Sequence, residues 1–236
     1  MTTTPLLPPG LLVTGFRPRG LGIAFRALGL LLSFVCVRLT AASPDVLVYG
    51  GTPGGIMAAI AAARGGASVL LVEPTHHVGG LTTGGLTHTD AHTYEGTTGL
   101  YHEFLNRVED YYRQRYGPDS QQLRDCDRGM QAEAYVNELV FEQMLRAEKA
   151  ITVKRGLHLT HVRVAAGNQK RTLQAASFAS RDGSVPVEEI TAKIFIDGSY
   201  EGDLMAKAGV EYRVGREGRA EYGESLAPEV ADGQLQ

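Results

Sequence analysis

A glycine-rich turn, followed at a distance by an acidic residue, is the part of this sequence best suited to chemistry. The turn, Gly50 to Gly55, comes after a short apolar run and before an alanine-rich segment. Glycines at such a place let the backbone turn tightly and approach a pyrophosphate, which the N-terminus of the following helix attracts. Glu73 stands 23 residues after Gly50, where an acid accepts hydrogen bonds from a ribose diol. The spacing therefore predicts a dinucleotide cradle.

The turn departs from the G-x-G-x-x-G fingerprint at one position. Gly50 and Gly55 match its first and third glycines, but Thr52 replaces the second. A Cβ at Thr52 narrows the space for a phosphate, whereas Gly51 and Gly54 keep the loop permissive. The alternative interpretation is a glycine-rich turn from a strand to a helix, followed by an ordinary solvated glutamate.

A second glycine cluster lies just past the acid. Gly79-Gly80 and Gly84-Gly85 are two pairs five residues apart. They could form a second backbone cradle along a long, extended cofactor. A simple nicotinamide-binding fold would proceed to its next helix at this point, so the cluster favours a flavin dinucleotide over a nicotinamide one.

His88, Asp90 and His92 bring two imidazoles and a carboxylate close together in the next loop. Three interpretations remain open. A metal site would need at least one more ligand from elsewhere, and we expect none. His88 or His92 could act as a general acid or base beside the cofactor. The simplest alternative is a set of polar loop side chains that face solvent.

The elements that must position these residues follow from the apolar pattern. Two short apolar runs at 46–49 and 69–72 flank an alanine-rich helix at 56–63, which Gly65-Gly66 ends. This order predicts a right-handed βαβ unit with two parallel, fully buried strands. Its glycine turn then lies at the carboxyl edge of the sheet.

Further elements fill the rest of the chain. Apolar residues at helical spacing predict packing helices over about 100–112, after a Thr97-Thr98 cap, and over 135–144. Four β-rich runs follow, and we interpret the first three as strands of the main sheet and of a crossover meander. The last run is interpreted as a single return strand, Ile190 to Ile196, that ends at Asp197-Gly198. The four runs are 151–154, 157–165, 172–179 and 187–196.

Charge and cysteine content exclude several classes of function. The formal net charge is −3, and the first 44 residues hold four arginines and no acid, which leaves 19 basic against 26 acidic residues from position 45 onward. A nucleic-acid binder would need a basic face, so we expect no such partner. The two cysteines, Cys36 and Cys126, cannot build a disulfide framework or a cysteine-rich zinc site.

The N-terminal segment, residues 1–43, has the pattern of a secretory signal peptide. Three arginines precede an 11-residue apolar run at 27–37, and small residues follow it. The run is too short to span the hydrocarbon core of a bilayer, although an uncleaved membrane anchor is the alternative. We therefore expect export to the periplasm or the extracellular space, with membrane contact only if the segment stays attached.

Two stretches, 45–86 and 194–226, resemble the FAD-dependent oxidoreductases of the glutathione-reductase type, and in particular a bacterial group of which many members are exported. The resemblance implies an α/β, FAD/NAD(P)-binding Rossmann-like fold with helical and β-meander insertions. The FAD-binding domain would cover 44–228 and be incomplete relative to the family, with a frayed tail at 229–236.

The resemblance also implies functional positions. Glu73 would bind the adenosine ribose, Asp197 and Gly198 would end the return strand near the adenine side, and Gly79, Gly80 and Leu81 would follow the cofactor towards the flavin ring. The pyrophosphate would lie at the first turn, made of Gly50, Gly51, Thr52, Pro53, Gly54 and Gly55.

The implied activity is hydride transfer from an unknown small-molecule substrate to FAD, with an unidentified electron acceptor. Two alternatives are a non-catalytic remnant or assembly subunit that retains the nucleotide cradle, and a nicotinamide-dependent dehydrogenase. The second glycine cluster disfavours the dehydrogenase.

Overall fold

The computed structural model describes residues 43–86, 90–91, 93–166 and 171–231. The chain divides into two units, 1–41 and 42–236, and the fold below is that of the second. His88 and His92 lie outside the described residues, as do Cys36 and positions 1–42 of the expected leader. Within the described ranges, no helix combines the length and the apolarity that crossing a membrane requires.

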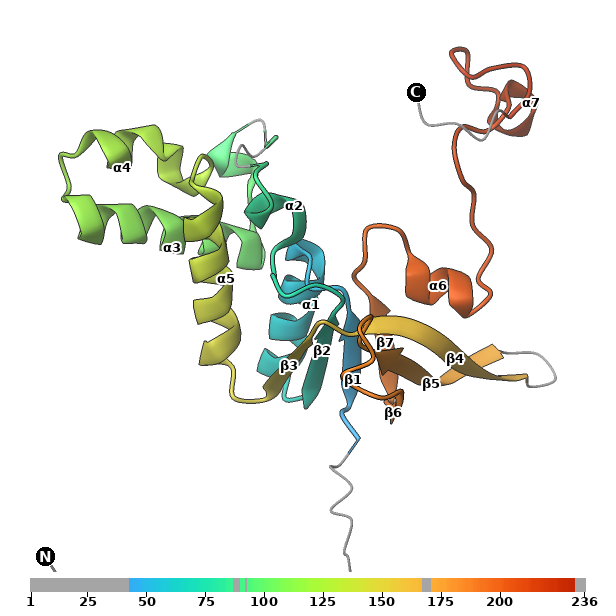
Figure 1. Ribbon diagram of the computed structural model, residues 1–236. Helices are drawn as coiled ribbons and strands as arrows, with labels where there is room; N and C mark the ends of the chain where they lie inside the picture. Colours follow the sequence, from blue (N-terminus) through green and yellow to red (C-terminus); the bar gives the residue numbers. More distant parts are fainter. Residues whose placement is uncertain (1–42, 87–89, 92, 167–170, 232–236) are drawn as a thin grey trace, which may run out of the picture. The chain divides into compact units, whose positions relative to one another are not determined.

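A four-stranded parallel sheet forms the centre of this unit (Figure 1). All residues of its two inner strands are buried, as the continuous apolar runs predict. The βαβ unit expected from the sequence is confirmed. In the order β3-β2-β1-β7, the strands are Ile151–Arg155, Val69–Glu73, Val46–Tyr49 and Ile194–Asp197.

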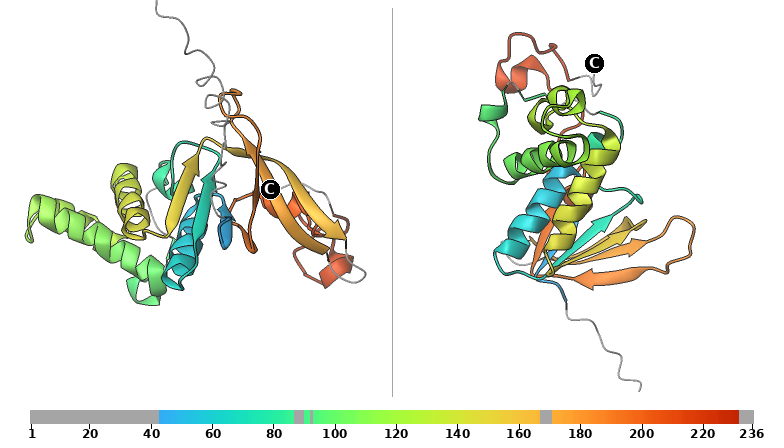
Figure 2. Two further views of the ribbon diagram at one scale, coloured as in Figure 1. Left: turned by 90° about the horizontal axis from the view of Figure 1, so that it is seen from below. Right: turned by 90° about the vertical axis from the view of Figure 1, so that its left-hand side faces the viewer.

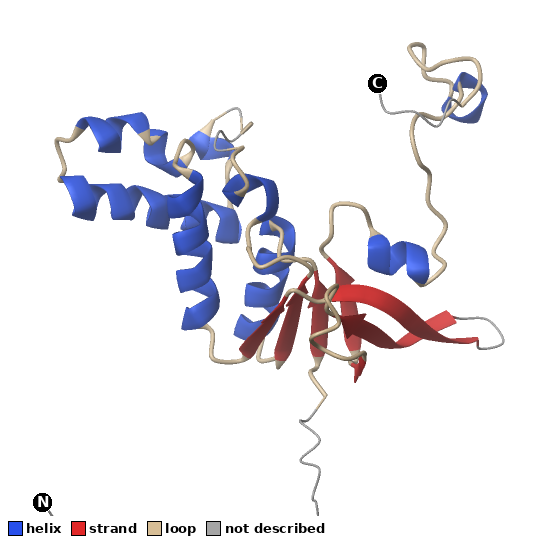
Figure 3. Cartoon of the chain, viewed as in Figure 1, coloured by secondary structure: helices blue, strands red, loops and turns tan. Residues whose placement is uncertain are grey.

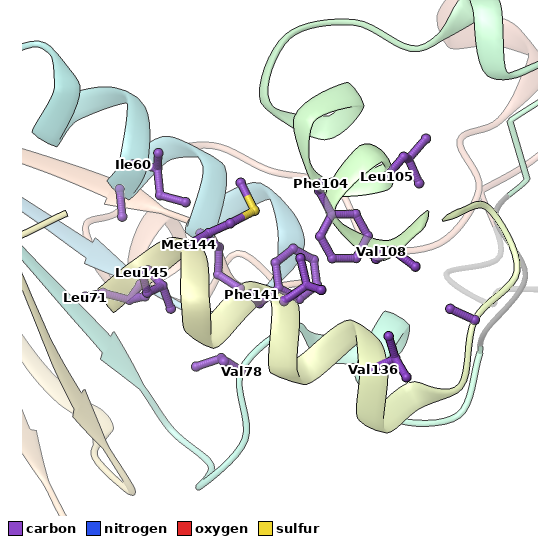
Figure 4. Close-up of a cluster of buried hydrophobic side chains, with 14 of the residues drawn as sticks. Ile60, Leu71, Val78, Phe104, Leu105, Val108, Val136, Phe141, Met144 and Leu145 are labelled. Carbon is purple, nitrogen blue, oxygen red and sulfur yellow. The ribbon is translucent and has the colours of Figure 1, made fainter. Parts of the chain in front are cut away.

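Helices cover one face of this sheet, as Figures 1 and 2 show. Phe104 and Phe141 stack there with ring centroids 4.2 Å apart, in a core that also holds Ile60, Leu71 and Met144 (Figure 4). The three long helices are α1 (Pro53–Arg64), α3 (Gly99–Tyr116) and α5 (Ala134–Ala147). Short helical segments connect them: α2 (Gly80–Thr83), η1 (Tyr94–Gly96), α4 (Gln121–Asp125) and η2 (Asp127–Gly129).

The two packing helices expected from the periodicity are present as α3 and α5, with two differences in detail. Thr98 is the N-cap residue of α3, but its side chain makes no capping hydrogen bond. Tyr135 is 66% exposed, whereas its neighbour Val136 is buried. Val140 and Met144 are buried as the spacing predicts, so the expected stripe is wrong only at its first position, Tyr135.

An antiparallel meander covers the opposite face of the parallel sheet (Figure 3). Leu47, Tyr49 and Val72 from the parallel strands pack there against Leu159 and Phe178. The rings of Tyr49 and Phe178 are 5.7 Å apart. The strands of the meander are β4 (His158–Ala166), β5 (Arg171–Ala179) and β6 (Glu188–Thr191).

The single return strand expected at 190–196 is wrong, because this run contains parts of two strands. Ile190 belongs to β6 and pairs with β5, whereas Ile194 begins β7 and pairs with β1. Between them the backbone N–H groups of Lys193 and Ile194 both donate to the carbonyl of Asp45, at 3.1 and 3.0 Å. These two hydrogen bonds mark the point where the chain leaves the meander and enters the parallel sheet.

Two short helices follow β7: α6 (Asp203–Lys207) and α7 (Arg219–Tyr222). Around α7, the backbone N–H of Arg219 donates to the carbonyl of Pro228 at 2.6 Å, and its guanidinium pairs with Glu229 at 2.6 Å. The tail expected to fray from 229 is therefore bonded at its first residue, and positions 232–236 lie outside the described residues.

Candidate functional site

A cavity of about 1000 Å³ lies at the carboxyl edge of the parallel sheet. Its walls include Gly50 at the end of β1, Glu73 at the end of β2 and Tyr200 just after β7. The chain runs from β1 to β2 on one side, while β7 lies on the other side of β1, so the strand order reverses here. Open α/β sheets bind their ligands at such a switch point.

Three glycine backbones are in direct contact at the first turn. Gly50 has φ +99°, which favours glycine. A Cβ built on Gly55 would lie 1.9 Å from the carbonyl oxygen of Gly50, and one on Gly198 would lie 2.8 Å from the Cα of Gly55. Strand β1, helix α1 and the end of β7 therefore approach as closely as backbones can, which is the role expected of the first and third glycines.

Thr52 does more than replace a glycine in the fingerprint. Its Oγ1 accepts the N–H of Gly55 at 3.2 Å and so caps α1. The same hydroxyl donates to the carbonyl of Gly198 at 2.6 Å. The expectation that this side chain only narrows the phosphate space is thus incomplete, because it ties the turn to the end of β7.

The first turn of α1 leaves room for an anion. Pro53 has no N–H, and the N–H of Gly54 has no hydrogen-bond partner among the residues that the structure describes. A Cβ on Gly54 would meet nothing closer than 3.8 Å. A free donor and the positive end of the helix dipole thus coincide beside the cavity, as phosphate binding requires.

Glu73 is 6% exposed, and its two carboxylate oxygens hold the loops on either side of it. One oxygen accepts the N–H of Gly51 at 2.6 Å, and the other accepts the N–H of Thr75 at 2.7 Å. Each oxygen has further lone pairs. The side chain lines the cavity, so the predicted hydrogen bonds to a ribose are sterically open to it.

The second glycine cluster forms the next part of the wall. The N–H of Gly79 donates to the carbonyl of Gly51 at 2.6 Å, which fastens the two glycine turns together. Gly79 and Gly80 have φ +98° and +52°, and Gly80 begins α2. Gly80 and Leu81 both line the cavity, as do Gly84 and Gly85 further along.

Asp197 does not line this cavity. Its carboxylate accepts hydrogen bonds from Ser199, through N–H and hydroxyl, and from the N–H of Met205 at 2.8 Å. Together with Ser199, whose hydroxyl accepts the N–H groups of Gly202 and Asp203, it caps the start of α6. Asp197 and Gly198 lie across β1 from Glu73, and their expected place near the adenine stays a prediction.

Sequence reasoning missed Tyr200 as a site residue. This side chain lines the cavity, and its hydroxyl oxygen accepts the N–H of Leu81 at 2.8 Å. The available signal was a large aromatic residue directly after Asp197-Gly198. Other cavity residues that were missed are Glu138, His158, Arg181, Ser199 and Lys207.

Besides the glycine turns, the cavity is lined by an imidazole–carboxylate pair, His77 and Glu138, with 3.0 Å between Nδ1 and Oε1. Burial raises the pKa of Tyr49, whose hydroxyl accepts the N–H of Leu159 at 3.3 Å. Burial also raises the pKa of Cys126, which lines a different cavity, and so disfavours its reactive thiolate form. No group of three or more metal-ligating side chains occurs in the described part of the chain.

Taken together, the residues fit the ADP portion of a dinucleotide. The glycine turn leaves no space for a Cβ at Gly55, and the N–H of Gly54 at the start of α1 has no acceptor in the described ranges. Glu73 offers carboxylate oxygens at the end of the neighbouring strand. Pyrophosphate and ribose require these groups in this order.

Comparisons with known proteins agree with this assignment. The family model for FAD dependent oxidoreductase matches residues 45–235. The resemblance expected from 45–86 and 194–226 is therefore confirmed at the level of this family, and the narrower glutathione-reductase type is corrected to the broader one. No curated protein sequence matches the chain.

Several solved structures align with part of this chain at TM-scores below 0.5. Thermovibrio ammonificans THI4 has a TM-score of 0.44 and 18% identity, over 80% of this chain and 75% of that one. L-proline dehydrogenase from P. horikoshii has a TM-score of 0.45 and 12% identity, over 74% and 58%. Glycerol-3-phosphate dehydrogenase from Bacillus halodurans, complexed with FAD, has a TM-score of 0.44 and 11% identity, over 71% and 37%. The chain thus spans about a third to three quarters of these proteins.

Proposed function

We propose that this chain, which belongs to the FAD dependent oxidoreductase family, holds FAD across the carboxyl edge of its parallel sheet and oxidises a small-molecule substrate by hydride transfer. FAD, the cofactor of the family, supplies the redox chemistry when it is bound. The observation that carries the proposal is the contact of Gly50, Gly55 and Gly198 beside the N–H of Gly54, for which the described residues provide no acceptor.

In this proposal the first turn binds the pyrophosphate. The N–H of Gly54 and the α1 dipole neutralise part of its charge. Thr52 keeps the turn in place by bonding Gly55 and Gly198 at once. Because Gly55 has no side chain, the helix can approach β1 closely enough to aim its N-terminus at the anion.

Glu73 orients the other half of the ADP group. With one oxygen on the N–H of Gly51 and the other on the N–H of Thr75, its carboxylate cannot swing away from the cavity. Its remaining lone pairs would accept the ribose hydroxyls. Charge-assisted hydrogen bonds of this kind contribute about 1.5–3 kcal/mol.

The substrate and the electron acceptor stay unnamed in this proposal, as does the group that moves the substrate proton. His88 and His92 are the candidates for that group by residue type, since an imidazole can accept a proton near neutral pH. Both histidines lie outside the described residues, and the variants below test their role.

The test uses the full chain, purified and reconstituted with FAD. We expect flavin absorption bands at roughly 370 and 450 nm that stay with the protein through gel filtration. Tight binding of NAD with no uptake of flavin would contradict the proposal. The anaerobic addition of sugar, amine or hydroxy-acid donors should then bleach the flavin bands with one of these classes.

Two variants decide between catalysis and binding alone. If a donor bleaches the wild type but not His88→Ala or His92→Ala, at equal FAD occupancy, the corresponding histidine moves the proton. If no donor bleaches the fully loaded protein, a non-catalytic role in nucleotide binding or assembly takes precedence over the oxidoreductase.

We also propose that the chain is exported. The support is the pattern of residues 1–43 alone, with three arginines ahead of the apolar run at 27–37. N-terminal sequencing of the protein recovered from its native cells should begin near Ser43. A protein that retains Met1 or Thr2 in the cytosolic fraction would refute export.

A further inference from the structure

The order of the strands gives the cofactor a direction along the sheet edge. Glu73 ends β2, Gly50 follows β1, and Gly198 follows β7, and these strands are neighbours in that order. If the ribose lies at Glu73 and the pyrophosphate at the start of α1, the riboflavin half continues towards the end of β7. This direction for the riboflavin half rests on the proposed function, in which the cavity binds FAD.

Tyr200 lies at that place. It comes three residues after Asp197, the last residue of β7, and its side chain lines the cavity while remaining 55% exposed. Its hydroxyl oxygen accepts the N–H of Leu81 at 2.8 Å. The contact joins two segments that are 119 residues apart in sequence.

Gly80 provides the space for this ring. A Cβ on Gly80 would lie 2.4 Å from the hydroxyl oxygen of Tyr200, 2.8 Å from its Cε2 and 2.9 Å from its Cζ. The φ of +52° at Gly80 also disfavours other residues. The glycine of the second cluster and the aromatic ring after β7 therefore form a single, mutually dependent wall.

We propose that Tyr200 contacts the riboflavin half of FAD and holds the Gly80–Leu81 turn against it. An aromatic ring offers a flat apolar face with a polar edge, which suits a flavin that is itself flat and polar at its rim. The hydroxyl keeps the amide of Leu81 paired at the cavity wall. Without it, that N–H depends on water for a partner.

The chain provides an optical readout of this contact because it has no tryptophan. Tyrosine is then its strongest electron donor to a photoexcited flavin. Such a donor quenches flavin fluorescence only when the two rings are close together. Phenylalanine has nearly the same shape but does not donate an electron in this way.

The experiment measures fluorescence lifetime and FAD affinity in the full chain. Tyr200→Phe should lengthen the lifetime of bound flavin. It should also weaken FAD binding by about threefold to tenfold, through the lost hydrogen bond to Leu81. Tyr212→Phe is the matched control, because Tyr212 is 53% exposed and is not among the residues lining the cavity. It should change neither quantity.

A second variant tests the shared wall. Gly80→Ala should displace the Tyr200 ring and lengthen the lifetime as well, while its effect on affinity should shrink in a Tyr200→Ala background.

If Tyr200→Phe binds FAD with the lifetime and affinity of the wild type, the proposal for Tyr200 is overturned. If the wild type takes up no FAD at all, the proposed function fails first. An unchanged lifetime in Gly80→Ala, with FAD bound, likewise argues against the contact.

Discussion

The two walls of the cavity are built in different ways. The first, residues 46–73, consists of two buried strands and the helix between them, all contiguous in sequence. The second brings the Gly79–Gly85 segment together with Ser199–Asp203, and Leu81 and Tyr200 in it are both more than half exposed. The first wall owes its position to the core, whereas the second depends on a few hydrogen bonds.

This difference separates rigid from adaptable parts of the site. In the first wall, Glu73 and Thr52 each bond one residue of the glycine turn and one residue outside it. In the second wall, the hydrogen bond from the N–H of Leu81 to the hydroxyl of Tyr200 is exposed to solvent. Replacement of Gly55 or Glu73 in the first wall should therefore alter both stability and FAD binding, whereas replacement of Tyr200 in the second should alter binding alone.

The largest effect is expected at Gly55. Gly55→Val places a branched side chain where a single Cβ would already lie 1.9 Å from the carbonyl of Gly50. The free energy of unfolding should fall by about 3 kcal/mol or more, and FAD binding should be lost. Thermal unfolding and FAD titration measure the two effects.

Gly54→Ala is the control for this change, since its Cβ would meet only Thr52 Oγ1 at 3.8 Å. Its stability should stay close to that of the wild type. If Gly55→Val binds FAD with wild-type affinity, the first wall is not the pyrophosphate site.

The next largest effect is expected at Glu73. Glu73→Ala leaves the buried N–H of Gly51 unpaired and removes the bond to the N–H of the exposed Thr75, at a cost of about 1–3 kcal/mol in stability. Loss of the ribose contact should also weaken FAD binding about tenfold or more. Glu73→Gln, which keeps the shape and an acceptor oxygen, should lose less. Equal FAD affinity in Glu73→Ala and wild type would make Glu73 a purely structural residue.

Replacement of Thr52 should lower stability less than replacement of Gly55 or Glu73. Thr52→Ala removes the cap of α1 and the bond to Gly198, so we expect a loss of about 1 kcal/mol in stability. Thr52→Ser keeps the hydroxyl and should stay near the wild type. The measurement is chemical denaturation. A more stable Thr52→Ala would show that the hydroxyl bonds contribute nothing.

The smallest effect is expected at the far end of α1, away from the cavity. The Arg64 guanidinium, with Arg107, lowers the pKa of Glu103 to about 2. Because the folded pKa lies below the unfolded value of 4.5, the contribution is present above pH 4.5 and is lost as the pH falls towards 2. Glu103→Gln should reduce stability at neutral pH by about 0.5 kcal/mol, since the pair is partly solvated.

FAD affinity should be unchanged in Glu103→Gln. The difference in stability between this variant and the wild type should vanish near pH 2. A difference that persists at that pH would assign the effect to packing rather than to charge.

The first wall could be predicted from the sequence because its signals are local. The apolar runs, the glycines at 50 and 55 and the acid at 73 lie within 28 residues and obey one pattern. The sequence also contains a signal for the cap at Thr52, since a threonine before a proline is typical of a helix start. The comparison with the G-x-G-x-x-G fingerprint registers the same position only as a missing glycine.

The second wall and the return strand could not be predicted in the same way. Nothing local pairs Tyr200 with Leu81, because the sheet brings them together. The run at 187–196 contains no turn residue at Ala192-Lys193, and the split into β6 and β7 depends on the carbonyl of Asp45, far away in the chain. Long-range contacts of this kind produce no pattern of apolar residues in the local sequence.

The contact of Gly198 with Gly50 and Gly55 has a consequence for synthesis on the ribosome. The turn is translated early, but the carbonyl that accepts the Thr52 hydroxyl arrives 143 residues after Gly55. At the usual speed of translation this interval lasts roughly 7 to 30 s. During that time the nascent βαβ unit has an apolar strand edge where β7 will pair, so a chaperone that shields β1 should increase the yield of folded protein.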